Sequence, residues 1–327
     1  MRFQVIDVPN QRSMHKMPVP RGGGLSFVIL TAVCFAVLAW TNVLPGRMCL
    51  ALSIPPLAVG FIGLFDDFSH TSRRLRLAVQ LFSATIGIWL IGGLPTLLLP
   101  TFTWQPSLLW LPLAAISLVW LTNLYNFMDG INGIAALEAI TVLGGAAYLT
   151  SNQSSSEWSF ALLIIAAIVA GFVPWNFPRA KIFMGDCGSG FLGCLIGLLV
   201  IATTVEQLLS LWSWMILLGV FLVDATWTLL RRMSSGQAWN EPHRSHAYQI
   251  ISQKINHHAY VTLGIMAINL VWLLPLAKLA QYSSFGLYWV ILAYTPLVLI
   301  CVWTKAGSLE IKNINAELKE TARQVNQ

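Results

Sequence analysis

Four aspartates stand at the ends of long apolar stretches of the sequence. Asp66 and Asp67 are adjacent, whereas Asp129 and Asp186 each stand next to a glycine. Adjacent carboxylates repel one another, so a cation is expected beside the pair. Mg²⁺ suits oxygen ligands with some retained waters, and it also binds phosphate oxygens. The four aspartates predict an intramembrane active site with a metal, whereas the alternative for the pair is a loop cap held by nearby arginines.

The segment from Asn123 to Gly133 is the most informative of the polar segments. In a helix, Asn126 and Asp129 lie three residues apart and therefore on one face. Gly130 and Gly133 permit close approach of the backbone to a ligand. Such a face is suited to reading a nucleotide base or holding a metal. The alternative is a patch of hydrogen bonds between helices.

The segment around Asp186 has the composition of a phosphate cradle at the start of a helix. It runs from Phe183 to Ser189, contains two glycines, and follows Arg179 and Lys181. Backbone N–H groups at a helix N-terminus favour anions. Asp186 would then place a carboxylate, or a metal bound to it, beside the phosphate.

Basic residues form two further segments. His243, Arg244 and His246 fall in one short run, and their side chains suit phosphate binding and proton exchange. Arg21 precedes three glycines, which favours either an anion-binding turn or simply the start of a helix. Asp224 lies inside an apolar stretch, and we interpret it as a structural partner more than as part of the site.

The elements that position these residues are predicted to be membrane-spanning helices. The 327 residues are 56% hydrophobic and 10% charged, against about 25% charged in soluble domains. The apolar runs are near the roughly 20 residues that a helix needs to cross a bilayer. We therefore expect an all-α, polytopic integral membrane protein, with one transmembrane catalytic domain over residues 1–304 and a cytoplasmic tail over residues 305–327. About ten transmembrane helices are expected, at Gly24–Leu44, Cys49–Phe65, Leu77–Leu94, Leu108–Tyr125, Ile131–Thr150, Trp158–Trp175, Phe191–Val205, Leu208–Leu230, Tyr260–Leu279 and Phe285–Thr304. The seventh of these is short, so a bend or a tilt is expected there.

Charge in the connections predicts the orientation of these spans. Of the 19 Lys and Arg residues, all but Arg47 and Lys278 fall in one set of connections. Because cytoplasmic loops carry the excess of Lys and Arg, both termini and the polar segments are expected in the cytoplasm. The net charge of +6 then reflects this inner face, which favours membrane lipids and anionic substrates, and not binding of nucleic acid.

In this order and at these positions, the polar segments resemble those of the polyprenyl-phosphate N-acetylhexosaminyl-1-phosphate transferase superfamily, glycosyltransferase family 4. The likeness runs from Asp7 to about Thr304, and the segment from Asp7 to Gly24 is similar to the family's first cytoplasmic loop. The combination of segments is specific, although no single one is. The run from His243 to Gln249 is most similar to the branch that initiates O-antigen synthesis.

The resemblance implies a reaction. The phosphate of undecaprenyl phosphate attacks the β-phosphorus of a UDP-N-acetylhexosamine, of the UDP-GlcNAc, UDP-FucNAc or UDP-QuiNAc type. The products are undecaprenyl-diphospho-sugar and UMP, and Mg²⁺ (or Mn²⁺) is required. The resemblance also implies the bacterial inner membrane as location, a role in O-antigen or related cell-envelope polysaccharide synthesis, and a homodimer.

Matched position by position, the resemblance also assigns residues. Asp66 would deprotonate or position the acceptor, and Asp67 and Asp186 would hold the metal. Asp129 and His246 complete the implied catalytic set. The implied substrate-binding residues are Arg21, Asn126, Asn132, Phe183, Lys181, Arg244 and His243.

Several positions depart from the family pattern. Many relatives have Asp where this chain has Asn132, whose amide could still pair with the uracil edge because it both donates and accepts. Tyr248 and Gln249 stand where some branches carry His, so the histidine grip on the diphosphate is thinner. His70 stands where the peptidoglycan branch usually has Lys.

Three other functions compete with this reading. A polytopic transporter would place its carboxylates near the bilayer midplane, whereas here they stand at span ends. A CDP-alcohol phosphotransferase would need an Asp-Gly-x-x-Ala-Arg pattern, which the segment after Asp129 does not continue. A catalytically inactive scaffold is the third alternative, and the intact aspartates argue against it.

Overall fold

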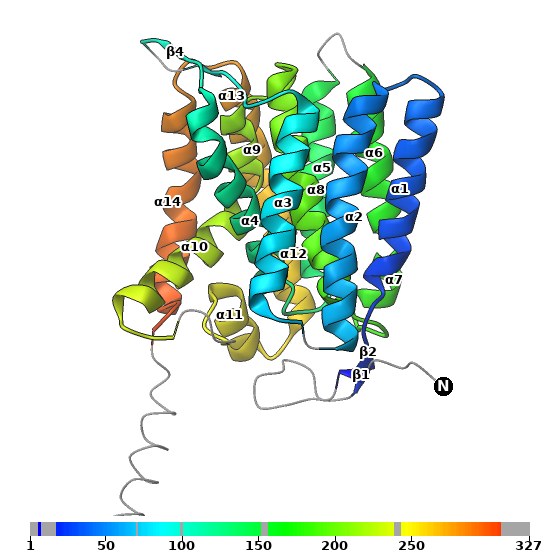
Figure 1. Cartoon of the computed structure of the whole chain (residues 1–327). Helices are drawn as coiled ribbons and strands as arrows, with labels where there is room; N and C mark the ends of the chain where they lie inside the picture. The colour runs from blue at the N-terminus through cyan, green and yellow to red at the C-terminus, as the bar shows by residue number, and fades with distance from the viewer. Residues whose placement is uncertain are drawn as a thin grey trace, which may run out of the picture.

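The computed structural model is a bundle of helices with two short β-hairpins (Figure 1). It describes residues 6–7, 18–69, 71–98, 101–151, 156–238 and 243–308. The expectations for His70, for most of the first loop and for the tail from residue 309 lie outside the described residues. In the described part the only strands are four two-residue pieces, so the predicted all-α class is confirmed.

The described elements follow one another along the chain with short connections. The α-helices are α1 (Gly24–Trp40), α2 (Gly46–Phe68), α3 (Arg73–Ile91), α4 (Leu111–Met128), α5 (Ile134–Thr150), α6 (Ser156–Ala170), α7 (Val173–Asn176), α8 (Gly185–Val205), α9 (Leu211–Leu217), α10 (Gly219–Ser234), α11 (Ala247–Ile255), α12 (His258–Ala267), α13 (Leu274–Gln281) and α14 (Gly286–Thr304). The antiparallel hairpins are β1 (Ile6–Asp7) with β2 (Val19–Pro20) and β3 (Leu97–Leu98) with β4 (Thr103–Trp104). A 3₁₀ turn, η1 (Leu108–Trp110), precedes α4, and the π-helical η2 (Ile268–Leu273) joins α12 to α13.

Every expected span corresponds to helix. Among the described residues, seven helical segments are long and apolar enough to cross a membrane, and the bent pair α9–α10 makes up to eight. The other two expected spans are α1 and α5, each of 17 residues. At 1.5 Å per residue, such a helix is roughly 26 Å long, slightly shorter than the apolar core of a bilayer. The chain is therefore a multi-pass membrane protein.

The bend lies in a different helix from the one expected. The seventh expected span is the continuous α8, which begins at Gly185 and so includes the glycine-rich turn that the sequence placed before it. The eighth expected span is broken instead, because α9 ends at Leu217 and α10 leaves its axis by 76°. The predicted bend in the seventh span was wrong, because its glycines are helical and its apparent shortness came from counting only the apolar residues.

Helix α8 is the centre of the bundle. In the most apolar 18-residue stretch of α8, 89% of the residues are buried, and α8 packs on α1, α2, α3 and α4. Close approach depends on small residues. A Cβ added at Gly188 would lie 2.8 Å from the Cα of Gly24, and one added at Gly193 would lie 2.7 Å from the Cα of Thr122. The core helix is thus fixed tightly against the helices that carry the polar segments.

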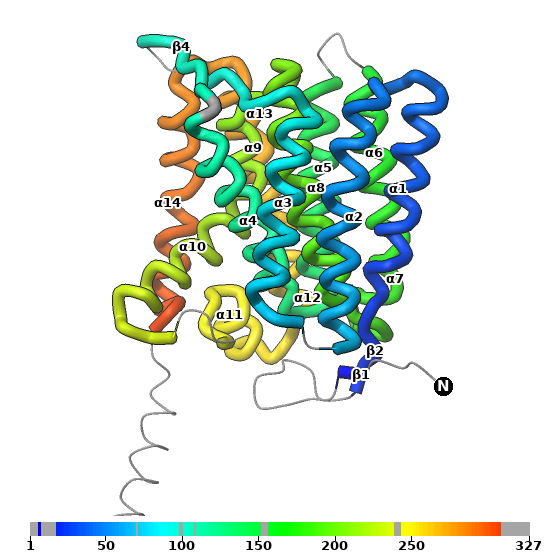
Figure 2. Tube along the Cα trace, viewed as in Figure 1, coloured from blue at the N-terminus to red at the C-terminus, as the bar shows by residue number. Residues whose placement is uncertain are grey.

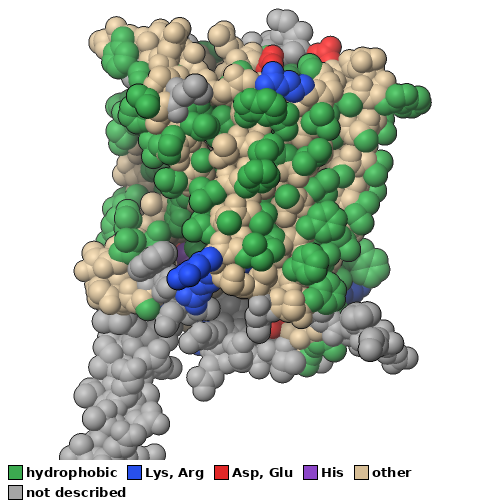
Figure 3. All heavy atoms as spheres, in the orientation of Figure 1, with side chains coloured by type: hydrophobic (Ala, Val, Ile, Leu, Met, Phe, Trp, Pro, Cys, Tyr) green, Lys and Arg blue, Asp and Glu red, His purple; other side chains and the backbone are tan. Residues whose placement is uncertain are grey.

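The two ends of the bundle differ. We call one end the carboxylate end; it holds the β1–β2 hairpin, α7 and α11. We call the opposite end the hairpin end, after the β3–β4 hairpin that it holds (Figures 1 and 2). On the face drawn in Figure 3, apolar side chains cover the middle, and Lys and Arg side chains gather near the ends. Exposed apolar residues such as Phe82 and Ile116 lie within spans, away from their ends, and suit contact with lipid.

Candidate active site

Asp67 joins the end of α2 to the start of α8. Its Oδ1 accepts a hydrogen bond from the backbone N–H of Asp186 at 3.1 Å, and its Oδ2 accepts one from Cys187 at 3.2 Å. A carboxylate that caps a helix N-terminus satisfies free N–H groups and complements the helix dipole. The helices approach so closely that a Cβ at Gly63 would lie 2.4 Å from the Asp186 carbonyl oxygen. Both oxygens of Asp67 are therefore already engaged.

Asp66 is held from the other side, by the start of α3. Its Oδ1 accepts hydrogen bonds from the backbone N–H and the hydroxyl of Thr71, both at 2.7 Å. Its Oδ2 accepts from Nη1 of Arg76, which also lies 3.4 Å from Oδ2 of Asp186. The alternative of an arginine-held loop cap is thus correct for Asp66, but only Arg76 of the three neighbouring arginines makes the contact.

Among the aspartates with a described contact, Asp186 has the most exposed side chain. Its Oδ1 accepts a hydrogen bond from Nδ2 of Asn126 at 2.9 Å, and the same Nδ2 donates to Ser189 Oγ at 3.0 Å. Its side chain is 32% exposed, against 15% for Asp66. Its Oδ2 lies 3.4 Å from Nη1 of Arg76, and its carboxyl also lies close to that of Asp66, so a further cation here would offset the repulsion between the two.

Asp129 shares the electrostatics of the other three. It directly follows α4, which ends at Met128, and its ψ of 52° is not helical, so Asp129 does not continue the helical face that the sequence predicts for it with Asn126. Burial raises its pKa to about 7, and the negative charges of Asp186 and Asp67 add to the rise. The four aspartates, here the carboxylate cluster, therefore form one unit in which added positive charge is strongly favoured.

The first loop lies against the glycine-rich turn. The N–H of Phe183 donates to the carbonyl of Pro20 at 2.8 Å, and Gly23 donates back to the carbonyl of Phe183 at 2.9 Å. Gly185 has φ +77°, and a Cβ there would lie 2.6 Å from Oδ2 of Asp67, so the turn requires glycine. This pairing brings Arg21 beside the carboxylate cluster.

Arg21 carries a counter-charge for the cluster. Its Nη2 lies 2.9 Å from Oδ1 of Asp7, across the β1–β2 hairpin. Burial, the largest influence, lowers the pKa of Arg21, but the hydrogen bond and charge of Asp7 and the charges of Asp67 and Asp186 raise it overall. Arg21 is therefore a permanent cation directed at the same region as the carboxylates.

The basic run lies at the N-terminus of α11. His246 is 3% exposed, and its ring lies 4.9 Å from that of His243. Burial, with the charges of His246 and Arg232, lowers the pKa of His243 to about 3, so His243 is neutral at physiological pH. Arg244 is half-buried and makes no hydrogen bond or ion pair with any other residue that the structure describes. Arg244 is thus a cation without a described partner.

Tyr248 and Gln249 have structural partners. The Tyr248 hydroxyl donates to the carbonyl of Phe127 at 3.0 Å, and Gln249 Oε1 accepts from the N–H of His246 at 3.3 Å. A Cβ at Gly130 would lie 2.1 Å from the Tyr248 hydroxyl oxygen. At these two departures from the family pattern, the side chains dock α11 onto the end of α4.

Asn132, Lys181 and Phe183 line a neighbouring part of the same end. Asn132 Nδ2 donates to the carbonyl of Pro178 at 3.1 Å. Lys181 is exposed, with its Nζ 5.5 Å from the ring centroid of Trp175, and Phe183 is half-buried. Asn132 and Lys181 are thus beside the cluster's elements, but no described contact joins either to a cluster carboxylate.

Sequence reasoning missed several polar partners. Arg76 and Thr71 contact carboxylates of the cluster directly, whereas Ser189 contacts Asn126, which in turn contacts Asp186. Asp224 lies 3.4 Å from Nδ1 of His246. Arg76 stands in an arginine-rich run whose members are equivalent by sequence. Only the helical phase of α3 against α2 selects it.

Oxygen donors that fit a magnesium ion are present. Among the described residues, no group of three or more His, Cys, Asp or Glu side chains is arranged to hold a metal. Mg²⁺ is commonly held by one or two carboxylates together with waters and substrate phosphates. Oδ2 of Asp186 meets that requirement, whereas both oxygens of Asp67 accept backbone hydrogen bonds. The donor set therefore fits the ion with Asp186 as its principal ligand.

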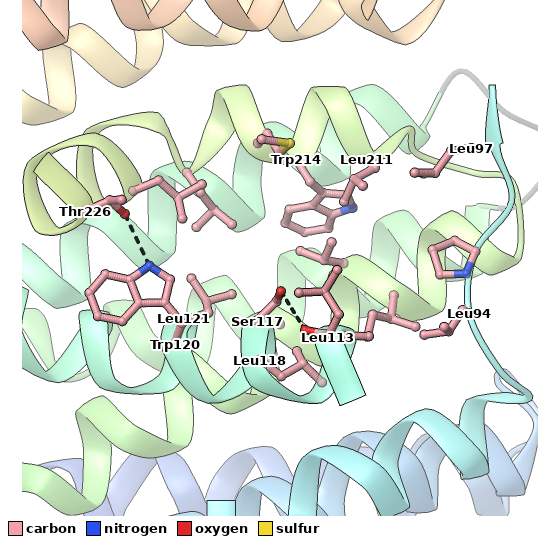
Figure 4. Close-up of a pocket in the computed structure, with 18 of the residues that line it drawn as sticks. Leu94, Leu97, Leu113, Ser117, Leu118, Trp120, Leu121, Leu211, Trp214 and Thr226 are labelled. Carbon is pink, nitrogen blue, oxygen red and sulfur yellow. Dashed lines mark hydrogen bonds between the residues drawn. The ribbon is translucent and has the colours of Figure 1, made fainter. Parts of the chain in front are cut away.

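A large apolar cavity lies along α4 and reaches the hairpin end of the bundle. It has a volume of about 720 Å³ and is lined by α4, α8, α9, α10, α14 and the β3–β4 hairpin. Figure 4 shows Ser117 and Trp120 of α4 facing Trp214 and Thr226, with Trp120 Nε1 donating to Thr226 Oγ1 at 3.2 Å. The next turns of α4 carry Asn123 and Asn126. On α4 the cavity lining ends at Leu121, five residues before Asn126.

The fold and the site together define a multi-pass membrane protein with carboxylates and cations gathered at one end. A family model described as Glycosyl transferase family 4 matches residues 49–204. That range contains all four aspartates of the cluster.

Three relatives are similar to this chain over most of their length. A probable undecaprenyl-phosphate N-acetylglucosaminyl 1-phosphate transferase of Bacillus subtilis is 29% identical over 84% of this chain and 75% of its own. An undecaprenyl-phosphate alpha-N-acetylglucosaminyl 1-phosphate transferase of Escherichia coli K12 is 28% identical over 88% and 80%. A phospho-N-acetylmuramoyl-pentapeptide-transferase of Heliobacterium modesticaldum is 31% identical over 67% and 70%. The chain belongs to glycosyltransferase family 4, the polyprenyl-phosphate N-acetylhexosaminyl-1-phosphate transferases.

Proposed function

We propose that this protein transfers N-acetylhexosamine 1-phosphate from a UDP-sugar to undecaprenyl phosphate and releases UMP. The observation that carries the proposal is a carboxylate cluster flanked by cations at one end of a membrane-spanning bundle that also holds an apolar cavity along α4. A reaction between a lipid and a nucleotide sugar needs both surfaces at one site. The printed names of the relatives describe transfers of this kind.

The cavity would hold the polyprenyl chain of the acceptor. Its lining is almost entirely apolar, and α4 leads from Leu113 inside it to Asn126 beside Asp186. The acceptor phosphate would then lie near Asp66 and Arg76. Arg76 would offset the negative charge of the phosphate, and Asp66 would position the attacking oxygen or accept its proton.

The donor would occupy the opposite side of the cluster. Arg21, Arg244 and Lys181 supply cations for the diphosphate, with His243 and His246 beside them. Asn126, Asn132 and Asp129 are assigned to the nucleotide, with Phe183 available to stack on uracil. The attacking phosphate oxygen forms a bond to the β-phosphorus, while the bond from that phosphorus to the UMP oxygen breaks.

Repulsion between the two phosphate groups is the main barrier that such a site must remove. A bound Mg²⁺ (or Mn²⁺) would neutralise diphosphate charge, with Asp186 as ligand and Asp67 behind it. Asp67 holds the N-terminus of α8 and so fixes where Asp186 points. In this proposal Asp67 supports the metal ligand Asp186, whereas the resemblance implies that both residues hold the metal.

The cell context follows from charge. The cations of the described residues lie at the carboxylate end, apart from Arg47 and Lys278. We assign this end, with both termini, to the cytoplasm of a bacterium, and the protein to its inner membrane as a homodimer. The run from His243 to Gln249 favours O-antigen or a related polysaccharide as the pathway. The transporter alternative is disfavoured, because the cluster lies at the ends of spans and not at mid-depth.

The proposal is tested by measuring UMP release in membranes that contain the protein. Undecaprenyl phosphate and Mg²⁺ are supplied with UDP-GlcNAc, UDP-FucNAc, UDP-QuiNAc or UDP-MurNAc-pentapeptide in turn. One donor should give UMP and lipid-diphospho-sugar in equal amounts. Absence of UMP release with all four donors, from folded protein, would reject the proposed function.

The Asp186→Asn variant tests the assignment of the metal ligand. UMP release should fall by at least about 10²-fold, because the variant loses the negative charge that offsets the ion. Glu206→Gln, an exposed acid at the hairpin end, is the matched control and should retain activity. Near-normal turnover of Asp186→Asn would place the metal elsewhere.

A further inference from the structure

Asp224 is a buried carboxylate that the proposed reaction does not use. It lies on α10 and is 5% exposed. Burying an ionised carboxylate is unfavourable unless hydrogen bonds and an opposite charge compensate. Its contacts therefore indicate what the charge is for.

Three of those contacts are hydrogen bonds. Oδ1 accepts from the backbone N–H of Ala247 at 2.9 Å and from the Thr228 hydroxyl at 3.2 Å, and Oδ2 accepts from the N–H of Tyr248 at 3.0 Å. Asp224 thus caps the N-terminus of α11 from a neighbouring helix. A neutral Asn or Ser also caps a helix, so capping alone does not require a buried charge.

The fourth contact is the imidazole of His246. Nδ1 of His246 lies 3.4 Å from Oδ1 of Asp224, and both side chains are almost fully buried. The ring is flanked by His243 at 4.9 Å and by Tyr248 at 5.7 Å between centroids. Gln249 Oε1 accepts from the backbone N–H of His246. The position and the plane of the imidazole are therefore fixed by side chains on both sides.

We propose that Asp224 is a positioning residue that orients His246 for the transfer reaction. A carboxylate 3.4 Å from Nδ1 favours the tautomer with the proton on Nδ1. Nε2 is then the ring atom left to exchange a proton with, or donate to, a phosphate oxygen. The inference rests on the proposed function, because His246 acts on phosphate only there.

Kinetics separate orientation from capping. Asp224→Asn retains an oxygen for the α11 N–H groups but removes the charge, so kcat for UMP release should fall about 10²-fold. KM for the UDP-sugar should stay within about threefold. Thr228→Val, which removes only the hydroxyl contact to Asp224, is the matched control and should keep kcat within about threefold.

A double-variant cycle tests the route of the effect. If Asp224 acts through His246, Asp224→Asn should lower kcat no further, within about threefold, in a His246→Gln background. Independent, multiplying losses would overturn the inference, and so would unchanged kcat in Asp224→Asn alone.

A spectroscopic measurement is independent of catalysis. In protein labelled with ¹⁵N-histidine, the resonance that disappears in His246→Gln should report the Nδ1–H tautomer or the doubly protonated ring in the wild type. An Nε2–H tautomer would overturn the inference even if Asp224→Asn does not fold. An Nδ1–H signal in a protein inactive with every donor would instead reject only the proposed function.

Discussion

At the scale of residues, the four carboxylates have unequal environments although the sequence presents them as equivalents. Asp67 uses both oxygens on backbone N–H groups, Asp66 is bound by Thr71 and Arg76, and Asp186, the most exposed of the three, contacts Asn126, Arg76 and the Asp66 carboxyl. Binding of an incoming cation should therefore depend most on Asp186. Arg76, which contacts two carboxylates, is the residue that links the acceptor side of the cluster to its metal side.

Replacement of Arg76 tests that link. Arg76→Gln removes the positive charge shared by Asp66 and Asp186, so KM for undecaprenyl phosphate should rise by about tenfold or more, the effect of losing a charge-assisted contact of roughly 1.5 kcal/mol. Arg73→Gln, an exposed neighbour on the same helix, should leave KM unchanged. Equal effects of the two variants would mean that only the net charge of α3 matters.

Asp129 predicts a dependence of stability on pH. Its pKa is about 7 in the folded protein against an ordinary value of 3.8. The folded state thus binds more protons between these values, so stability should fall as pH rises from about 4 to 7 and level off above. Asp129→Asn should unfold at a higher temperature than wild type at pH 8 in EDTA, with a smaller difference at pH 5. A difference that grows toward pH 5 would contradict the assignment.

At the scale of elements, α5 and η2 are joined by a buried polar pair. Asn269 Nδ2 donates to Glu138 Oε2 at 2.6 Å and to Thr141 Oγ1 at 2.8 Å. Glu138 Oε1 and Asn269 Oδ1 have no hydrogen-bond partner among the described residues. A proton on Glu138 would satisfy both atoms, because a carboxylic acid can donate to the amide oxygen.

Two substitutions test this pair. Glu138→Gln also presents one donor and one acceptor, so its free energy of unfolding should stay within about 1 kcal/mol of wild type. Asn269→Leu leaves the buried Glu138 without its partner and should cost about 1–3 kcal/mol. Thermal unfolding in detergent measures both. A larger loss in Glu138→Gln than in Asn269→Leu would show that Glu138 is ionised.

At the scale of the whole molecule, the 76° break between α9 and α10 matters most for function. It carries α10 obliquely toward α11, which places Asp224 at the N-terminus of α11 (Figure 1). Helices α9 and α10 also line the apolar cavity, together with α4. One bend therefore contributes both to the cavity for a lipid and to the support of the basic run.

Filling the cavity tests its role. Ser117→Trp adds a large side chain at a position that lines the cavity, so KM for undecaprenyl phosphate should rise by about tenfold while KM for the UDP-sugar stays constant. Ile116→Trp, on the same helix but exposed outside the cavity, is the control. Equal responses of the two variants would show that the polyprenyl chain binds elsewhere.

The sequence by itself determined the membrane-spanning helices and the common end at which the four aspartates lie. Long apolar runs force helices in a bilayer, and alternating helix directions bring alternate span ends to one side. Only the tertiary structure decided that Asp67 caps α8, that Arg76 is the pairing arginine, that Tyr248 docks on Phe127, and that Asp224 faces His246. Most of these contacts join residues more than 100 positions apart. They depend on the rotation and depth of each helix against its neighbours. Close packing at glycines such as Gly63 and Gly188 sets this rotation and depth, and helical periodicity alone does not encode them.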